Sequence, residues 1–389
     1  MVSGVSSSLV GLHRVGSREA DDLLAESGFQ GQLALRGGPV LALPAHVREA
    51  AIAALSEPDR RTSRGLLELR EAIAAVLGAD AGIEVDPEQE LLVTNGAMQG
   101  LATVFRTLLD QGDEVIIPTP NFFFDGSVRL AGGTPIYVEC REEDGWSWDI
   151  ERIEAAVTGR TRVIIICNPT NPTGFLPMRE QLAGIVEIAR NHDLIVVSDE
   201  SYHHSAYDGR PFVSVASFCD DADRLVTIRS LSKSHSLAGW RMGYVHASPG
   251  LTAEFSRVFE WECLHCAYVP QRVATAALTG PQDWLQGVND EYQGIRDRLL
   301  IAISQSEWLS CVEPEAGPFL FPNLLRAEEA TGTDAYAQLL EVGIHTVPGR
   351  YFHSTGHVRL PFGAAPETVS RLAALLEGFT PNTGRRLDP

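Results

Sequence analysis

The sequence predicts an α/β protein, with a mostly parallel sheet covered by helices on both faces and a smaller α+β domain beside it. From about residue 91, short apolar runs rich in β-branched residues alternate with amphipathic stretches of helical period. Near residue 290 this alternation stops, and a helical pattern over 290–306 is followed by shorter apolar runs. Fully apolar strands between helices are typical of a parallel sheet that is buried on both faces.

Each element follows from its own pattern along the chain. The expected strands are the apolar runs at 91–94, 114–118, 135–140, 162–167, 194–199 and 224–229. The expected helices between them cover 97–109, 123–132, 149–158 and 178–191. Because such sheets bind ligands beyond the carboxyl ends of their strands, the residues that follow each run are the first candidates for a site.

The 389 residues are enough for two domains. We predict that residues 1–50 form an N-terminal segment that joins the small domain. Residues 51–289 then form the large domain, and residues 290–389 form the small C-terminal domain.

The bulk composition disfavours several classes of partner. With 31 Lys and Arg against 51 Asp and Glu, the formal charge is −20, which repels nucleic acid and anionic membrane surfaces. No apolar run reaches the roughly 20 residues of a membrane helix, and the first residues lack a secretory signal pattern. Six cysteines show no disulfide framework, and Cys263 and Cys266 lack the second pair of a metal site. We therefore expect a cytoplasmic protein with reduced thiols and no metal.

Lys233 is the only lysine in the chain, among 30 arginines. Arginine serves for surface charge throughout the sequence, so the retained lysine indicates chemistry that a guanidinium cannot perform. That chemistry is imine formation, which needs a free amine. Lys233 follows the apolar run 224–229, and a lysine desolvated at a strand end can lose its proton and condense with an aldehyde.

The residues at the other strand ends suit one cofactor, pyridoxal 5′-phosphate. Asp199 ends an apolar run, and its carboxylate can keep a pyridine nitrogen protonated. Tyr202 can bond a phenolic oxygen, and the rigid turn "NPTNPTG" aims Asn171 back at the strand ends. A phosphate is suited by the helix start in "NGAMQG" (95–100) and by Ser230, Ser232 and Arg241.

Some of these candidate site residues, taken singly, can also be explained by a structural role alone. The glycine turn at 95–100 can open a helix for steric reasons alone, and Arg241 can pair with any acid. Of the three aromatics Phe122, Phe123 and Phe124, one can stack on a flat ligand, and we expect at least two to pack in the core.

The ordered set of segments resembles the fold type I pyridoxal-phosphate enzymes, in the branch of the class I and II aminotransferases. The resemblance implies a seven-stranded large-domain sheet and a homodimer with sites at its interface. It rests on eight segments in order: "GGPVLALP" (37–44), "RGLLELREAIA" (64–74), "VTNGAMQ" (93–99), "NPTNPTG" (168–174), "SDESY" (198–202), "SLSKSHSLAGWRMG" (230–243), "VPGRYF" (347–352) and "HVRLPF" (357–362).

The resemblance also implies roles for individual residues. Lys233 would form the aldimine with the cofactor and then move the proton, with Asp199 and Tyr202 as the other catalytic residues. The implied cofactor-binding residues are Gly96, Ala97, Met98, Phe122, Asn171, Asp199, Tyr202, Ser230, Ser232, Lys233 and Arg241. Phe122 would stack on the ring. Arg359 would grip the substrate α-carboxylate, together with Asn171 and with Gly37, which closes over it.

Two positions depart from the family pattern. Arg60 stands where the family often has a tyrosine that reaches the neighbouring subunit's phosphate. It belongs either to a solvated basic patch or to the dimer interface, where it would meet a phosphate or a carboxylate. His235 stands where an aromatic residue is usual, and it either packs or serves as a second proton carrier.

The expected function is transfer of an amino group between an α-amino acid and a 2-oxo acid. Arg60 and His235 keep an alternative open, namely elimination, replacement or cyclisation on an amino acid, as in capreomycidine-forming enzymes. A third possibility, the effector domain of a transcription regulator, is disfavoured by the acidic chain and by the short stretch before the family match. The segment 259–268 is a candidate for the substrate side-chain pocket.

Overall fold

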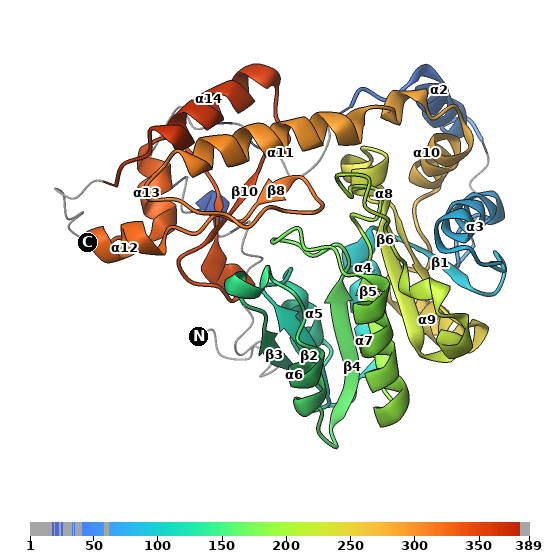
Figure 1. Ribbon diagram of the computed structural model, residues 1–389. Helices are drawn as coiled ribbons and strands as arrows, with labels where there is room; N and C mark the ends of the chain where they lie inside the picture. Colours follow the sequence, from blue (N-terminus) through green and yellow to red (C-terminus); the bar gives the residue numbers. More distant parts are fainter. Residues whose placement is uncertain are drawn as a thin grey trace, which may run out of the picture.

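A mostly parallel sheet forms the centre of the molecule (Figure 1). The computed structural model describes residues 18, 20–22, 25, 33, 35, 41–57 and 62–381. Within these residues seven strands form one sheet in the order β1-β7-β6-β5-β4-β2-β3. Their bounds are β1 Leu91–Thr94, β2 Glu114–Thr119, β3 Thr134–Glu139, β4 Thr161–Cys167, β5 Ile195–Asp199, β6 Leu225–Ser230 and β7 Gly243–His246.

The predicted fold class is confirmed, with one strand that the pattern did not indicate. The six expected strands lie at the predicted places to within one residue at either end. The seventh, β7, runs antiparallel to both of its neighbours, β1 and β6. Its sequence, "GYVH", is short and mixed in polarity, so neither an apolar run nor an alternation marks it as a strand.

Helices cover both faces of this sheet, because its strands send alternate side chains to opposite sides. On β4, Val163 and Ile165 join the core cluster on one face, while Ile164 and Ile166 join the cluster on the other. Figure 1 shows α6 and α7 side by side on one face. The helices of this region are α2 Ala45–Ala54, α3 Leu67–Ala81, α4 Ala97–Leu108, α5 Phe124–Leu130, α6 Ile150–Ala155, α7 Arg179–His192, α8 Leu231–Ser234, α9 Pro249–Cys263 and α10 Tyr268–Thr279.

A separate core forms in the C-terminal part of the chain. It is built by residues of α11, α12, α13 and α14 around a small antiparallel sheet in the order β8-β10-β9, and Leu33 joins it. The bounds are α11 Val288–Ser304, β8 Phe319–Leu320, α12 Leu325–Thr331, α13 Ala335–Glu341, β9 Val347–Pro348, β10 Val358–Pro361 and α14 Pro366–Glu377. Helix α11 spans the distance between the two parts (Figure 1).

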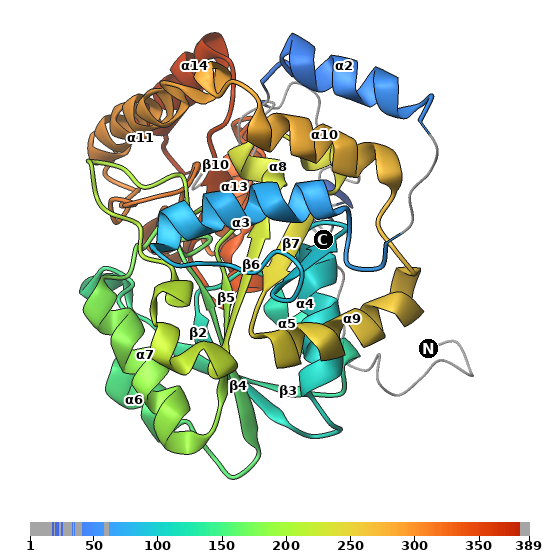
Figure 2. The same cartoon turned by 90° about the vertical axis from the view of Figure 1, so that its right-hand side faces the viewer.

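Helix α2 lies across the predicted boundary at residue 50. It packs along α10, as Figure 2 shows, and its Val47 and Ala54 belong to the core of the large sheet. Among the described residues, none of the helices combines the length and the apolar character that a membrane span requires.

Candidate active site

The carboxyl ends of β4, β5 and β6 open on a cavity of about 310 Å³. The turn after β4 contributes Asn171, the end of β5 contributes Asp199, and the short helix α8 after β6 contributes Lys233. Of the residues singled out in the sequence, the cavity is lined by Ala97, Met98, Phe122, Asn171, Asp199, Tyr202, Ser230, Ser232, Lys233, Arg241 and Arg359. The fold therefore brings residues from five of the eight segments, together with Phe122, to one place.

The remaining predicted site residues divide into two groups. Gly96 stands beside the cavity at the start of α4, with a φ of +84°, and a Cβ built on it would lie 2.4 Å from Nη2 of Arg241. A larger residue would therefore push Arg241 away from the helix start. Gly37 and Arg60 lie outside the described residues.

Four further residues line the cavity without having been singled out: Cys167, Ser201, Ala238 and Phe319. Ser201 had a usable signal, since it follows Asp199 by two residues and serine often bonds to a nearby carboxylate. Phe319 had none, because it comes from β8 of the small sheet and reaches the cavity only through the packing of the two parts.

Asp199 is a buried carboxylate, with 5% of its surface exposed. One of its oxygens, Oδ1, accepts hydrogen bonds from the backbone N–H and the hydroxyl of Ser201, at 3.0 and 2.6 Å. Burial raises the pKa of Asp199, and the two bonds from Ser201 act against that rise. Within the part of the chain that the structure describes, no cation pairs with Asp199, so its charge is uncompensated.

Lys233 lies in an environment that favours its neutral amine. Burial, together with the positive charges of Arg359 and Arg241, lowers the pKa of Lys233 to about 8. A sizeable fraction of the amine is then unprotonated at neutral to mildly alkaline pH. The arrangement supplies a nucleophile and proton carrier at this position.

Arg359 enters the cavity from β10 of the small sheet. Its Nη1 donates to Oδ1 of Asn171 over 3.2 Å, and its guanidinium carbon lies 5.0 Å from the centre of the Phe352 ring. Its Nε is buried and has no hydrogen-bond partner among the described residues. The guanidinium therefore keeps donors for an anionic ligand.

The aromatic residues separate as the sequence suggested. Phe122 is half-buried and lines the cavity, whereas Phe123 and Phe124 are buried in the core. Tyr202 packs edge-on against Phe319, with ring centres 5.1 Å apart. Burial raises the pKa of Tyr202, so its hydroxyl keeps its proton and can donate a hydrogen bond.

His235 does not line this cavity. Its Nδ1 lies 2.8 Å from the hydroxyl of Ser234, and the ring is also hydrogen-bonded to Gln282. Burial lowers the pKa of His235 to about 4, against the opposing effect of Gln282. A neutral ring held between two partners fits the packing interpretation of this residue.

The cavity fits pyridoxal 5′-phosphate by the chemistry of its donors and acceptors. The uncompensated Asp199 offers an anion to a protonated ring nitrogen, and the amine of Lys233 offers a nucleophile to an aldehyde. The first N–H groups of α4 have no acceptor within the helix, and Arg241, Ser230 and Ser232 add cation and hydroxyl donors for a phosphate.

Comparisons with known proteins agree with this chemistry. The sequence model of the family described as aminotransferase class I and II matches residues 36–376. An aspartate aminotransferase of Bacillus subtilis is 33% identical, over 88% of this chain and 90% of its own length. A probable aspartate/prephenate aminotransferase of Aquifex aeolicus is 32% identical over 86% of both chains. The solved structure of an aspartate aminotransferase from Thermus thermophilus with maleate has a TM-score of 0.89 and 28% identity, over 97% of this chain and 100% of that one.

Proposed function

The chain belongs to the class I and II aminotransferases, which use pyridoxal 5′-phosphate, and on this premise we propose how its residues move an amino group from an amino acid to a keto acid. The observation that carries the proposal is the convergence of the single lysine with Asp199 and Arg359 in one cavity. The comparisons lend no support to the alternative of elimination, replacement or cyclisation.

Four sets of residues would hold the cofactor. Lys233 would bind its aldehyde carbon, and Asp199 its ring nitrogen. Asn171 and Tyr202 would reach the ring hydroxyl, with Phe122 against the ring face. The phosphate would be bound by the helix start at Gly96, Ala97 and Met98 with Ser230, Ser232 and Arg241. When bound, pyridoxal 5′-phosphate supplies a protonated ring that withdraws electrons and so makes a hydrogen on the amino acid's Cα acidic.

Lys233 would carry the proton away from Cα and return it two atoms further along, on the carbon that the cofactor brings as its aldehyde. Its lowered pKa, about 8, suits this work, because a proton carrier is most effective when its pKa lies near the working pH. Ser201 would support the chemistry indirectly, since its two hydrogen bonds hold the carboxylate of Asp199 in one position. Arg241, whose charge also lowers the pKa of Lys233, would serve both phosphate and amine.

Arg359 would bind the α-carboxylate of the substrate. Its bond to Asn171 orients the guanidinium, and its unpartnered Nε leaves a donor for the carboxylate. A fork of two donors would fix which bond to Cα stands perpendicular to the cofactor ring. Gly37 would close over this carboxylate. Because two of the relatives are named for aspartate, we place aspartate first among the amino acids to test.

A homodimer is the expected assembly, and an apolar surface supports it. Two apolar side chains near the end of α2, Ile52 and Leu55, expose 68 and 74% of their surface. Two near the end of α9, Trp261 and Leu264, expose 94 and 69%. The ends of α2 and α9 face the same side of the molecule, at the right of Figure 2. Arg60 would lie near this interface. Light scattering should give twice the chain mass, and Trp261→Glu should shift the protein toward the monomer if this surface forms the interface.

The division into a large domain over 51–289 and a small domain from 290, joined by residues 1–50, remains a proposal. Its support is the separate C-terminal core, to which Leu33 belongs. The packing of α2 on α10 suggests that the first boundary lies before residue 45. The cytoplasmic location also remains a prediction, in agreement with the six free cysteines.

The absorption spectrum of the cofactor-loaded protein tests the function. Mixed with amino acids and no keto acid, a transaminase loses its aldehyde-form band and stays in the pyridoxamine form until a keto acid restores it. Return of the band without keto acid, while the amino acid is consumed, would instead indicate elimination, replacement or cyclisation. Borohydride reduction should attach the cofactor to Lys233 in the natural protein and leave Lys233→Arg unlabelled.

A further inference from the structure

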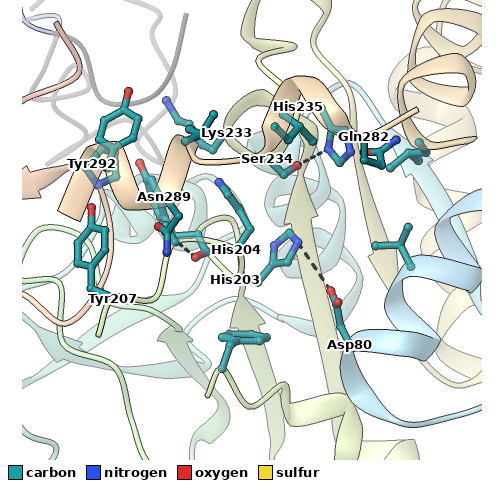
Figure 3. Close-up of a pocket in the computed structure, with 18 residues that line it drawn as sticks. Asp80, His203, His204, Tyr207, Lys233, Ser234, His235, Gln282, Asn289 and Tyr292 are labelled. Carbon is teal, nitrogen blue, oxygen red and sulfur yellow. Dashed lines mark hydrogen bonds and ion pairs between the residues drawn. The ribbon is translucent and has the colours of Figure 1, made fainter. Parts of the chain in front are cut away.

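A second cavity, of about 450 Å³, lies beside the cofactor cavity (Figure 3). Among the described residues the two share only Tyr202 and Lys233. The second cavity is enclosed by α3, the chain after β5, α8, the end of α10 and the first turn of α11. It therefore adjoins the amine of Lys233 and, apart from Tyr202 and Lys233, is lined by different side chains from those assigned to cofactor and substrate.

Much of the wall of this cavity is apolar and aromatic. Its apolar residues come from α3, α10, α11 and the segments that follow β5, α10 and α11, and they are Val76, Phe212, Leu278, Leu285, Val288 and Pro318. The rings of Tyr207 and Tyr292 add aromatic surface. Polar side chains complete the wall, among them His203, His204 and Gln282, and a volume of this size with a largely apolar surface is typical of a small-molecule site.

The charged groups at this cavity already have partners. The carboxylate of Asp80 lies 2.5 Å from Nη1 of Arg229 and 3.8 Å from Nε2 of His203. The other charged residue, Lys233, is the one assigned to the cofactor in the loaded enzyme. A charged ligand would therefore find no unpaired counter-charge, so the cavity favours an uncharged ligand.

Two polar side chains on α11 each have an atom without a hydrogen-bond partner among the described residues. Asn289 donates its Nδ2 to the backbone oxygen of Ala206, which leaves its Oδ1 as a free acceptor. Within the described chain neither this Oδ1 nor the hydroxyl of Tyr292 has a hydrogen-bond partner. Asn289 and Tyr292 are three residues apart, so they lie on the same face of α11, opposite His235 and Gln282 in Figure 3.

We propose that this cavity binds a small uncharged aromatic molecule that carries an amide. The amide N–H would donate to Oδ1 of Asn289, and the ring would lie against the apolar wall. Because Tyr202 and Lys233 also line the cavity, a ligand here contacts the active-site amine without occupying the substrate's place. The site is thus a regulatory one.

Benzamide is the probe, and titration calorimetry on the cofactor-loaded enzyme is the measurement. We expect a Kd of about 1 mM for a ligand of this size. Acetophenone has the same number of non-hydrogen atoms but no N–H, and it should bind about tenfold more weakly. Benzoate, the charged analogue, should not compete with benzamide, because its carboxylate suits Arg359 in the other cavity.

Three variants locate the bound probe. Leu285→Trp fills the cavity and should weaken benzamide binding at least about tenfold. Asn289→Leu should bring benzamide to the affinity of acetophenone. Ile301→Trp, on the outer side of α11 where Ile301 is 60% exposed, adds the same indole outside the cavity and should change nothing. Thermal melting of each variant establishes that it is folded.

The visible absorption band of the cofactor-loaded enzyme should change when benzamide contacts Lys233. Saturating benzamide should shift the pH midpoint of this band in the natural protein and in Ile301→Trp, and not in Leu285→Trp. The proposal is overturned if benzamide shows no binding at about ten times the expected Kd, if benzoate displaces it, or if Leu285→Trp binds it unchanged. Each of these results leaves the assignment of the aminotransferase unaffected, because binding is measured without turnover.

Discussion

Arg359 donates a hydrogen bond from its Nη1 to Oδ1 of Asn171 over 3.2 Å. Arg359 lies on β10 of the small sheet, and Asn171 lies in the turn after β4 of the large sheet. The bond therefore joins the two sheets at the wall of the cofactor cavity. Arg359 therefore contacts the cavity in which the substrate would bind, and its position depends on how the two sheets are placed relative to each other.

Arg359→Lys tests the assigned grip on the substrate carboxylate. Lysine keeps the charge but cannot offer two parallel donors, so kcat/KM for the amino acid should fall about 100-fold, chiefly through KM. Steady-state kinetics of the purified variants measures this. Arg350→Lys is the matched control, because Arg350 pairs with Asp334 at the exposed surface and should retain its kinetics. Equal losses in both variants would contradict the assignment.

The pH dependence of cofactor loading tests the environment of Lys233. Only the neutral amine reacts with an aldehyde, and its fraction increases as pH rises through the pKa of Lys233, which burial lowers to about 8. The rate at which apoenzyme takes up pyridoxal 5′-phosphate should therefore rise with pH, with a midpoint near 8. Stopped-flow absorbance follows the reaction.

Arg359→Gln should move this midpoint upward, because it removes a positive charge that lowers the pKa of Lys233. Arg298→Gln, an exposed position on α11 that bonds to Ser370, should leave the midpoint in place. A midpoint close to the ordinary lysine value of 10.5 in the natural protein would refute the desolvated environment.

Asp199→Asn should affect stability and activity in opposite directions. Burial raises the pKa of Asp199 above its unfolded value, so the stability that this residue contributes is present below the unfolded pKa and is lost as pH rises through the raised folded pKa. At neutral pH the apo variant should melt at a higher temperature than the natural apoenzyme. Its further stabilisation by the cofactor should shrink, and kcat should fall at least about 100-fold, because the ring nitrogen loses its anion. Calorimetric melting with and without cofactor separates these effects.

Arg229 anchors the strand that leads to Lys233. It is fully buried on β6 and pairs with Glu200, also fully buried, at 3.1 Å, and with Asp80. Arg229→Met would leave the carboxylate of Glu200 uncompensated, so the free energy of unfolding should fall by roughly 3–5 kcal/mol. Denaturant unfolding measures the change.

Arg257→Met is the control for this experiment. Its pair with Glu254 is exposed on both sides, so its loss should cost less than about 1 kcal/mol. If both variants lost the same small amount, the buried pair would contribute no more than a surface pair, contrary to the expectation.

Local patterns alone located most of the sheet and much of the site. The apolar runs that became β4 and β5 are continuous because both faces of these strands are buried, and burial of this kind is visible in the sequence. Asp199 could be singled out because it closes such a run, and Lys233 because it follows shortly after the run 224–229. The chemistry of both side chains is out of place in a core. The uniqueness of Lys233 added a signal that no structure was needed to read.

The tertiary structure decided what depends on contacts between distant segments. Strand β7 is inserted antiparallel between β1 and β6, and Phe319 reaches the cavity from another sheet. The side to which His235 turns, away from the cofactor cavity and toward Gln282, depends on how the end of α8 meets the segment that follows α10. The second cavity likewise exists only where α3, α10 and α11 meet. The residue types and the periodicity of a segment indicate which of its residues are buried and what chemistry they can perform. Which distant surfaces meet is decided by the packing of the whole chain.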